Sequence, residues 1–160
     1  MMNGICLRYA SNKEEAEDVL QDAFIKAFNS LKAYSGKGPL GAWMRKITVN
    51  TALEQYRKNK SLKNFGLMID VTETKLTVDD NAIEQLELED LLVKIQALPS
   101  GFRTIFNLYA VEGYTHKEIG ELLGISDGTS KSQYSRARVI LRGMIQEEIE
   151  VEQQKLNYAK

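Results

Sequence analysis

Short polar and cationic side chains gather in one segment of the second half of the chain, and their chemistry suits nucleic acid. Residues 128–144 carry hydroxyl, amide, lysine and arginine side chains and no carboxylate. Hydroxyls and amides can hydrogen-bond to base edges, and the cations can bind phosphates. The helix face that we expect to reach DNA holds Thr129, Ser130, Lys131, Ser132, Gln133, Ser135, Arg136 and Arg138.

The pattern around this segment predicts a helix-turn-helix. Thr115 and Glu118 have the spacing of a capping box, so we expect a short helix to begin there. Gly124 then allows a tight turn, and Ser126 is the expected N-cap of a last helix that runs to about Glu150. The second helix of such a pair can lie in the major groove of duplex DNA.

A second cationic segment lies in the first half of the chain. Residues 32–63 hold eight lysines and arginines against the single carboxylate of Glu54, in a chain whose net charge is −1. Aromatic residues and the pair Asn50–Thr51 lie in the same segment, a combination typical of sites that bind single-stranded DNA. Trp43 falls in an apolar helical stripe and is expected to be core, whereas Asn50 either faces solvent or lines a pocket.

Helices are expected to position all of these groups. Residues 11–34 show the clearest helical period, and Ser11 with Glu14 is spaced as a capping box. A glycine-rich break at 35–39 separates this helix from the next, which should end near Asn59. The apolar stripe of the first helix is Ala16, Val19, Leu20, Ala23, Phe24, Ala27, Phe28 and Leu31, and its outer face is Glu14, Glu15, Asp18, Gln21 and Asp22.

The helical pattern is lost over residues 64–82, which are acidic and contain many poor helix formers. This segment either shields the basic helix or is simply a solvated linker. Helical stripes then return and lead into the helix-turn-helix. The sequence therefore predicts an all-α protein of two small helical domains, 1–63 and 83–160, joined by an acidic linker.

Composition excludes several classes of protein. The chain has one cysteine, Cys6, and one histidine, His116, so it can form neither an internal disulfide nor a Cys/His zinc site. No apolar run approaches the roughly 18 residues of a membrane span, and the start lacks the pattern of a signal peptide. We therefore expect a cytoplasmic protein without metal or cofactor, with Cys6 as buried packing and His116 as an exposed polar residue.

Three blocks together resemble the extracytoplasmic-function (ECF) sigma factors of bacterial RNA polymerase. They are the run EAEDVLQDAF at 15–24, the block 38–57 and the block 115–142, which occur in the family's order and with similar spacing. The resemblance covers nearly the whole chain. It implies an alternative sigma factor, which is not an enzyme and which binds core RNA polymerase and recognises the −10 and −35 promoter elements.

The resemblance also implies roles for particular residues. It assigns Asp18, Gln21 and Asp22 to the coiled coil of the polymerase clamp and the second domain to the −35 element and the polymerase flap. An anti-sigma factor is a further partner that such proteins often have. The implied −10 contacts are Arg45, Lys46, Asn50, Thr51, Arg57 and Lys58, with Asn50 capturing a flipped base, and the −35 contacts include Lys131, Ser132, Ser135 and Arg136.

The chain departs from the family in two ways. Family members usually carry about one more helix before the position of Met1, and Ser130 and Gln133 stand where an aliphatic and a basic residue are frequent. The second departure could change promoter preference without abolishing DNA binding.

Other functions fit the residues less well. A conventional helix-turn-helix regulator of duplex DNA would leave the acidic and basic helices of the first half without a role. A DNA recombinase has candidate nucleophiles in Tyr56 and Tyr134 but lacks an accompanying set of arginines and histidines. A helical protein-interaction module that never touches DNA would not need the observed segregation of charge.

Overall fold

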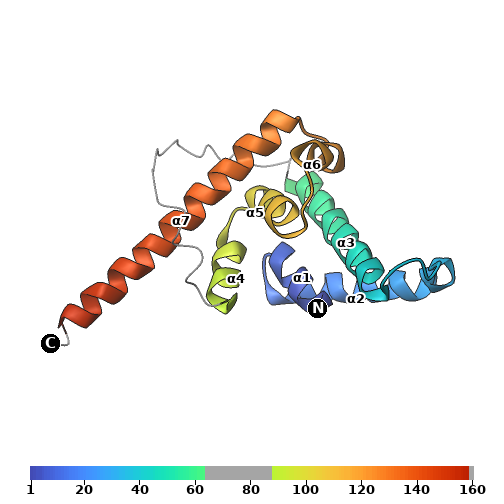
Figure 1. The fold of residues 1–160 in the computed structure, drawn as a ribbon, viewed down its shortest axis with the longest axis horizontal. Helices are drawn as coiled ribbons and strands as arrows, with labels where there is room; N and C mark the ends of the chain where they lie inside the picture. The colour runs from blue at the N-terminus through green and yellow to red at the C-terminus, as the bar shows by residue number, and fades with distance from the viewer. Residues whose placement is uncertain (64–87, 159–160) are drawn as a thin grey trace. The chain divides into compact units, whose positions relative to one another are not determined.

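The computed structural model describes residues 1–63 and 88–158, and every element within these ranges is helical (Figure 1). The chain divides into two compact units, Met1–Val71 and Thr72–Lys160. The all-α architecture expected from the hydrophobic periodicity is confirmed. The expected linker, residues 64–82, lies outside the described residues.

Unit 1 is built around a long helix, α3, that contacts both helices preceding it. All three helices contribute fully buried side chains, among them Ile5, Ala16 and Leu53. Its described elements are α1 (Met2–Tyr9), α2 (Lys13–Ser30), the short 3-10 turn η1 (Leu31–Ala33) and α3 (Leu40–Lys63).

Helix α2 begins one residue later than the sequence predicted. The side-chain oxygen of Asn12 accepts a hydrogen bond from the backbone N–H of Glu15 at 2.8 Å. The backbone N–H of Ser11 in turn donates to the Glu15 carboxylate at 2.6 Å. The capping pair is therefore Asn12 with Glu15, and not Ser11 with Glu14. Asparagine and serine are about equally good N-caps, so residue type alone does not distinguish the two pairs.

Only the small members of the α2 stripe are buried. Phe24 and Phe28 are 40% and 73% exposed, and Leu31 is also exposed, so the apolar stripe in the sequence is wider than the buried face of the helix. Small residues at intervals of three and four make a narrow row that lets neighbouring helices approach closely. The buried row consists of Ala16, Val19, Ala23 and Ala27.

Unit 2 contains four α-helices and one π-helical turn among its described residues. Pro99 separates the first two helices, as the sequence predicted, and has extended backbone angles. The π-helical turn was not anticipated, because residues 102–110 read as one regular stripe. The elements are α4 (Leu88–Ala97), α5 (Ser100–Phe106), the π turn η3 (Asn107–Val111), α6 (His116–Leu123) and α7 (Asp127–Tyr158).

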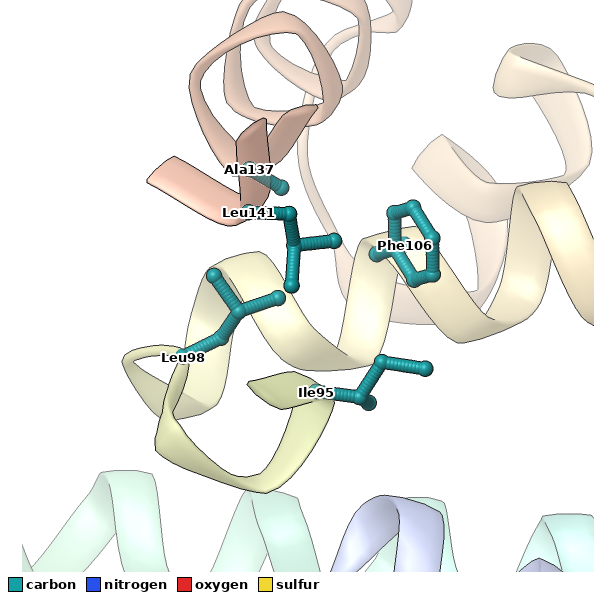
Figure 2. Packing of buried hydrophobic residues seen from close by; sticks show 5 residues of the cluster. All are labelled: Ile95, Leu98, Phe106, Ala137 and Leu141. Carbon is teal, nitrogen blue, oxygen red and sulfur yellow. The ribbon is translucent and has the colours of Figure 1, made fainter. Parts of the chain in front are cut away.

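The core of unit 2 forms where α4 and α5 pack on α7. Figure 2 shows Ile95, Leu98 and Phe106 turned toward Ala137 and Leu141 of α7. Leu141 is completely buried, and Leu91, Phe102, Tyr134 and Ile140 pack around the cluster. Helix α7, drawn orange to red in Figure 1, continues past its expected end at Glu150 to Tyr158.

The helix-turn-helix of unit 2 has the local structure that its sequence predicted. Thr115 and Glu118 form both hydrogen bonds of a capping box at the start of α6. Gly124 ends α6 in the left-handed region, at φ +67°, where glycine is favoured. The Ser126 hydroxyl accepts from the backbone N–H of Thr129 at 3.0 Å and caps α7. The capping box, the glycine turn and the serine cap are thus all confirmed.

Candidate nucleic-acid and protein interfaces

Four exposed side chains follow one side of the first turns of α7. We call them the α7 strip: Lys131, Ser132, Ser135 and Arg136. Their spacing of three and four residues brings them together on a helix. Lys131 Nζ lies 2.7 Å from the Asp127 carboxylate, and the Ser132 hydroxyl donates to the carbonyl of Thr129 at 3.0 Å. The strip therefore presents two cations and two hydroxyls to solvent, and Lys131 is held in an ion pair with Asp127.

The other residues that we expected on this face lie deeper. Thr129, Gln133 and Arg138 are half-buried. The Thr129 hydroxyl lies 2.8 Å from that of Ser126, within the cap of α7. Ser130 is fully buried, so its expected exposure was wrong. These three half-buried residues border the α7 strip, whereas Ser130 belongs to the interior of the helix-turn-helix.

His116 is also placed differently from expectation. Its ring is half-buried and stacks on Tyr109, with ring centroids 4.2 Å apart and planes 10° from parallel. Its Nδ1 lies 3.0 Å from the hydroxyl oxygen of Ser130. Tyr134 completes the group, and burial raises the pKa of its hydroxyl despite the nearby Arg138. His116 is thus a packed residue of the helix-turn-helix rather than a solvated one.

Helix α3 carries the second cationic surface. Lys46, Asn50 and Arg57 are exposed and follow each other at intervals of four and seven residues, which brings them to one side of the helix. We call these three residues the α3 strip. Lys58 is exposed next to Arg57, and Arg45 is half-buried. The exposed amide of Asn50 is open both to solvent and to a ligand bound on this surface.

Thr51 does not share this surface. It is buried, and its hydroxyl donates to the carbonyl of Ile47 at 2.9 Å. Thr48 has the same arrangement, with its hydroxyl donating to the carbonyl of Met44 at 2.8 Å. Both hydroxyls are therefore satisfied within α3, so the structure separates Thr51 from its exposed neighbour Asn50.

The single carboxylate of α3 is neutralised by α2. Glu54 forms an ion pair with Lys26, and the side-chain amide of Asn59 donates to the Glu15 carboxylate at 2.7 Å. These two contacts connect the basic helix to α2 at separate points. The negative charge of Glu54 consequently offsets little of the positive charge along α3.

Trp43 is neither fully buried nor an open platform. It is half-buried and pairs with Tyr34, with ring centroids 5.4 Å apart and planes tilted by 45°. The Tyr34 hydroxyl donates to the carbonyl of Gly38. The aromatic pair thus fixes the loop that leads into α3.

The acidic face of α2 continues into exposed apolar residues. Asp18, Gln21 and Asp22 are all exposed. Phe24, Ile25 and Phe28 follow at helical spacing and are 40%, 51% and 73% exposed. We call these six residues the α2 strip. An exposed apolar group bordered by polar residues is typical of a protein-binding site.

Sequence reasoning placed Phe24 and Phe28 in the apolar stripe of this helix and did not identify them as part of a binding surface. The signal that could have separated them is side-chain size. The small residues of the stripe are buried, whereas its large residues are half-buried or exposed.

Neither a cluster of metal ligands nor a membrane-spanning helix is present among the described residues. Within residues 1–63 and 88–158 there is no group of three or more histidine, cysteine or acidic side chains that could hold a metal ion. None of the helices in those ranges is long and apolar enough to cross a membrane. Cys6 is fully buried, and this burial raises the pKa of its thiol to about 11, consistent with packing.

Comparison with known families identifies the class of protein. The model of sigma-70 region 2 matches residues 2–62, and the model of sigma-70 region 4 matches residues 88–141. The first match covers the helices of unit 1 and the second covers α4 to α6 and the first part of α7. Together they describe the paired domains of a sigma factor of RNA polymerase.

Individual relatives indicate which group of sigma factors the chain resembles. The ECF sigma factor SigW of Bacillus subtilis is 29% identical over 153 residues, which cover 89% of this chain and 82% of SigW. The ECF sigma factor SigE of Mycolicibacterium smegmatis is 31% identical over 143 residues, covering 86% of this chain and 54% of SigE. The chain therefore belongs to the ECF sigma factors. It is an alternative sigma factor, which binds core RNA polymerase and directs it to specific promoters.

A solved structure supports the fold. The sigma factor RpoE of Bartonella quintana, in complex with the anti-sigma factor NepR, superposes with a TM-score of 0.55 at 23% identity. The match covers 91% of this chain and 89% of RpoE.

Proposed function

We propose that the two halves of the chain divide the recognition of polymerase and promoter. Residues 1–63 bind the polymerase clamp and the −10 element, residues 83–160 read the −35 element and contact the flap, and residues 64–82 connect them. One observation carries this assignment, namely the different chemistry of the three strips. The α2 strip is acidic and apolar, whereas the α3 and α7 strips are polar and cationic.

The α7 strip is proposed to read the −35 element in the major groove. Its side chains lie at the start of α7, directly after the turn of the helix-turn-helix, where a recognition helix contacts base edges. Arg136 can bind a guanine or a phosphate, and the two serines can approach closely because they are short. Arg136→Ala should weaken −35 binding by about 1–3 kcal/mol if it contacts a base. Polymerase binding should be unchanged.

The α3 strip is proposed to hold the melted −10 element. Lys46 and Arg57 can neutralise phosphates, and the exposed amide of Asn50 lies between them along the helix, where it can hydrogen-bond to a flipped base. Arg45 and Lys58 would add charge at the edge of this surface, and the buried Thr51 would support Asn50 by packing. Asn50→Ala should impair promoter opening more than initial docking, which permanganate footprinting and a mobility-shift assay can separate. Equal loss at both steps would count against a base pocket.

The α2 strip is proposed to bind the clamp coiled coil. Asp18 and Asp22 supply charge and Gln21 a hydrogen-bonding amide, while Phe28 supplies apolar area that is otherwise open to water. Charge complementarity would orient the encounter, and burial of the aromatic rings would stabilise the complex.

The test is a pull-down of purified bacterial core RNA polymerase by the full chain. Asp18→Arg/Asp22→Arg should abolish capture and leave duplex DNA binding intact. The control is Glu147→Arg/Glu150→Arg, which makes the same charge change on exposed carboxylates of α7. Equal loss of polymerase capture in both variants would mean that capture depends on net charge alone. That result would refute the assignment of the α2 strip.

We further propose that the chain works in the cytoplasm and that an anti-sigma factor regulates it, as NepR binds RpoE in the relative described above. The exposed rings of the α2 strip offer such a partner and polymerase a shared apolar surface. A partner purified with the chain from its own cells should then be displaced by excess core polymerase. Simultaneous binding of both would contradict a shared surface.

A further inference from the structure

His116 joins three elements of the helix-turn-helix. It is the first residue of α6, its ring stacks on Tyr109 of η3 at 4.2 Å, and its Nδ1 lies 3.0 Å from the Ser130 hydroxyl of α7. The ring of Tyr134, one turn further along α7, lies 5.7 Å away. The chain's only histidine therefore contacts the first two turns of α7 from the side opposite to solvent.

Ser130 makes this contact depend on a hydrogen bond. Ser130 is completely buried. Its backbone N–H donates to the carbonyl of Ser126, and its hydroxyl forms the hydrogen bond with His116. A buried hydroxyl without a partner costs free energy, and an alanine or valine at this position would need none. The bond thus couples the orientation of α7 to the position of His116.

The same turns of α7 carry the proposed promoter contacts. Lys131 and Ser132 directly follow Ser130, and Ser135 and Arg136 directly follow Tyr134. Any rotation of α7 about its axis would move buried and exposed residues together. Hydrogen bonds to base edges weaken steeply with changes in distance and angle, so a small displacement would reduce sequence discrimination.

We propose that His116 is a positioning residue for −35 recognition and acts through the hydroxyl of Ser130. This inference rests on the proposed role of the α7 strip and adds a residue that does not itself touch DNA. With a neutral ring, the bond forms in either tautomer: the Ser130 hydroxyl donates to Nδ1 when Nε2 carries the ring proton, and accepts from Nδ1–H when Nδ1 carries it. Stacking on Tyr109 holds the ring plane so that Nδ1 faces Ser130.

The test compares two probes with holoenzyme assembled from the full chain and core polymerase. The first probe is a duplex that wild-type holoenzyme selects from a random-sequence pool, and the second is the same duplex with its upstream element scrambled. The ratio of the two affinities measures discrimination. Urea denaturation followed by circular dichroism is measured for each variant, because unfolding of unit 2 would also lower the ratio, and only variants that stay folded enter the comparison.

The variants are chosen by the geometry of the hydrogen bond. Ser130→Ala removes the hydroxyl without adding bulk, and His116→Gln moves the hydrogen-bonding group one bond further from the backbone. Each should lower the discrimination ratio about tenfold, the effect of losing one base contact. The double variant should lose no more than either single one, because both remove the same bond. His116→Asn, whose amide oxygen is as many bonds from the backbone as Nδ1, should restore part of the ratio.

The outcomes separate this inference from the proposed function. If wild-type holoenzyme does not distinguish the two probes, the proposed −35 role fails and the positioning role fails with it. If wild type discriminates and both single variants keep the full ratio, only the positioning role is overturned. Independent, additive losses in the double variant would also overturn it, because the two residues would then act separately.

Discussion

Gly120→Ala tests how closely the two helices of the helix-turn-helix approach. Gly120 lies in α6 and is buried. A Cβ added there would lie 2.7 Å from the carbonyl oxygen of Ile125 and 3.6 Å from the backbone nitrogen of Asp127. The same turn is closed by the backbone N–H of Ile125, which donates to the Gly120 carbonyl at 3.0 Å. The turn therefore has no room for a methyl group and cannot move away without breaking its own hydrogen bond.

Two opposing effects determine how much Gly120→Ala changes the free energy of unfolding. Replacing glycine by alanine inside a helix stabilises it by about 1 kcal/mol, because the unfolded chain loses less freedom. Forcing a methyl group into a closed contact costs about 1–3 kcal/mol, and here the neighbour is backbone rather than a flexible side chain. The steric cost should prevail, so we expect a net destabilisation of unit 2 of up to about 2 kcal/mol.

The matched control is Gly143→Ala in α7. A Cβ at Gly143 would meet no atom within 4 Å, so only the favourable helix effect should operate. Urea denaturation followed by circular dichroism should show the two variants shifting in opposite directions. If Gly120→Ala stabilises the protein as Gly143→Ala does, the inferred close approach of α6 to the turn is refuted.

The remaining predictions concern the DNA surface, acid sensitivity and the core of unit 2. Asp127→Asn should raise the affinity of the full chain for duplex DNA about fivefold at low salt, because it releases Lys131 from an exposed ion pair worth at most about 1 kcal/mol. Fluorescence anisotropy measures this gain, which should shrink at high salt, and an unchanged affinity at low salt would contradict the pairing. The hydrogen bonds from Thr115, first from its backbone N–H and then from its hydroxyl, hold the pKa of the Glu118 carboxyl below its ordinary value of 4.5. A lowered folded-state pKa stabilises the fold above the ordinary value, and this contribution is lost as pH falls through the lowered one. The difference in unfolding free energy between wild type and Glu118→Gln should therefore be largest near neutral pH and vanish in acid, whereas a constant difference would argue against the capping box. Leu141→Ala should destabilise unit 2 by about 2–5 kcal/mol, because Leu141 is completely buried in its core, and a loss below 1 kcal/mol would be inconsistent with that burial.

Local chemistry made much of the helix-turn-helix predictable. The capping box at Thr115 and Glu118 and the cap at Ser126 involve partners three residues apart, and the turn at Gly124 needs only a backbone angle. These features depend only on residues close to one another in the sequence, so they can be predicted without knowledge of the fold. The same holds for the cationic character of α3, which is a property of composition.

The N-cap of α2 was predicted one residue too early. Ser11 with Glu14 and Asn12 with Glu15 have the same spacing, and both serine and asparagine are good caps. The π-helical turn at Asn107–Val111 was not predicted, because the apolar spacing over residues 102–110 is that of a regular helix.

By itself, the sequence determined that this protein is all helical, that charge of opposite sign is concentrated on different helices, and that its three blocks match the ECF sigma factors. Only the tertiary structure decided which members of a wide apolar or polar face are buried. Phe28 is exposed because the neighbouring helices cover only the row of small residues beside it. Ser130 and Thr51 are buried while Lys131 and Asn50 next to them are exposed, because burial depends on the side from which other helices pack. Periodicity gives the spacing of a face, but its width and its orientation toward a neighbour are set by contacts between residues far apart in the chain.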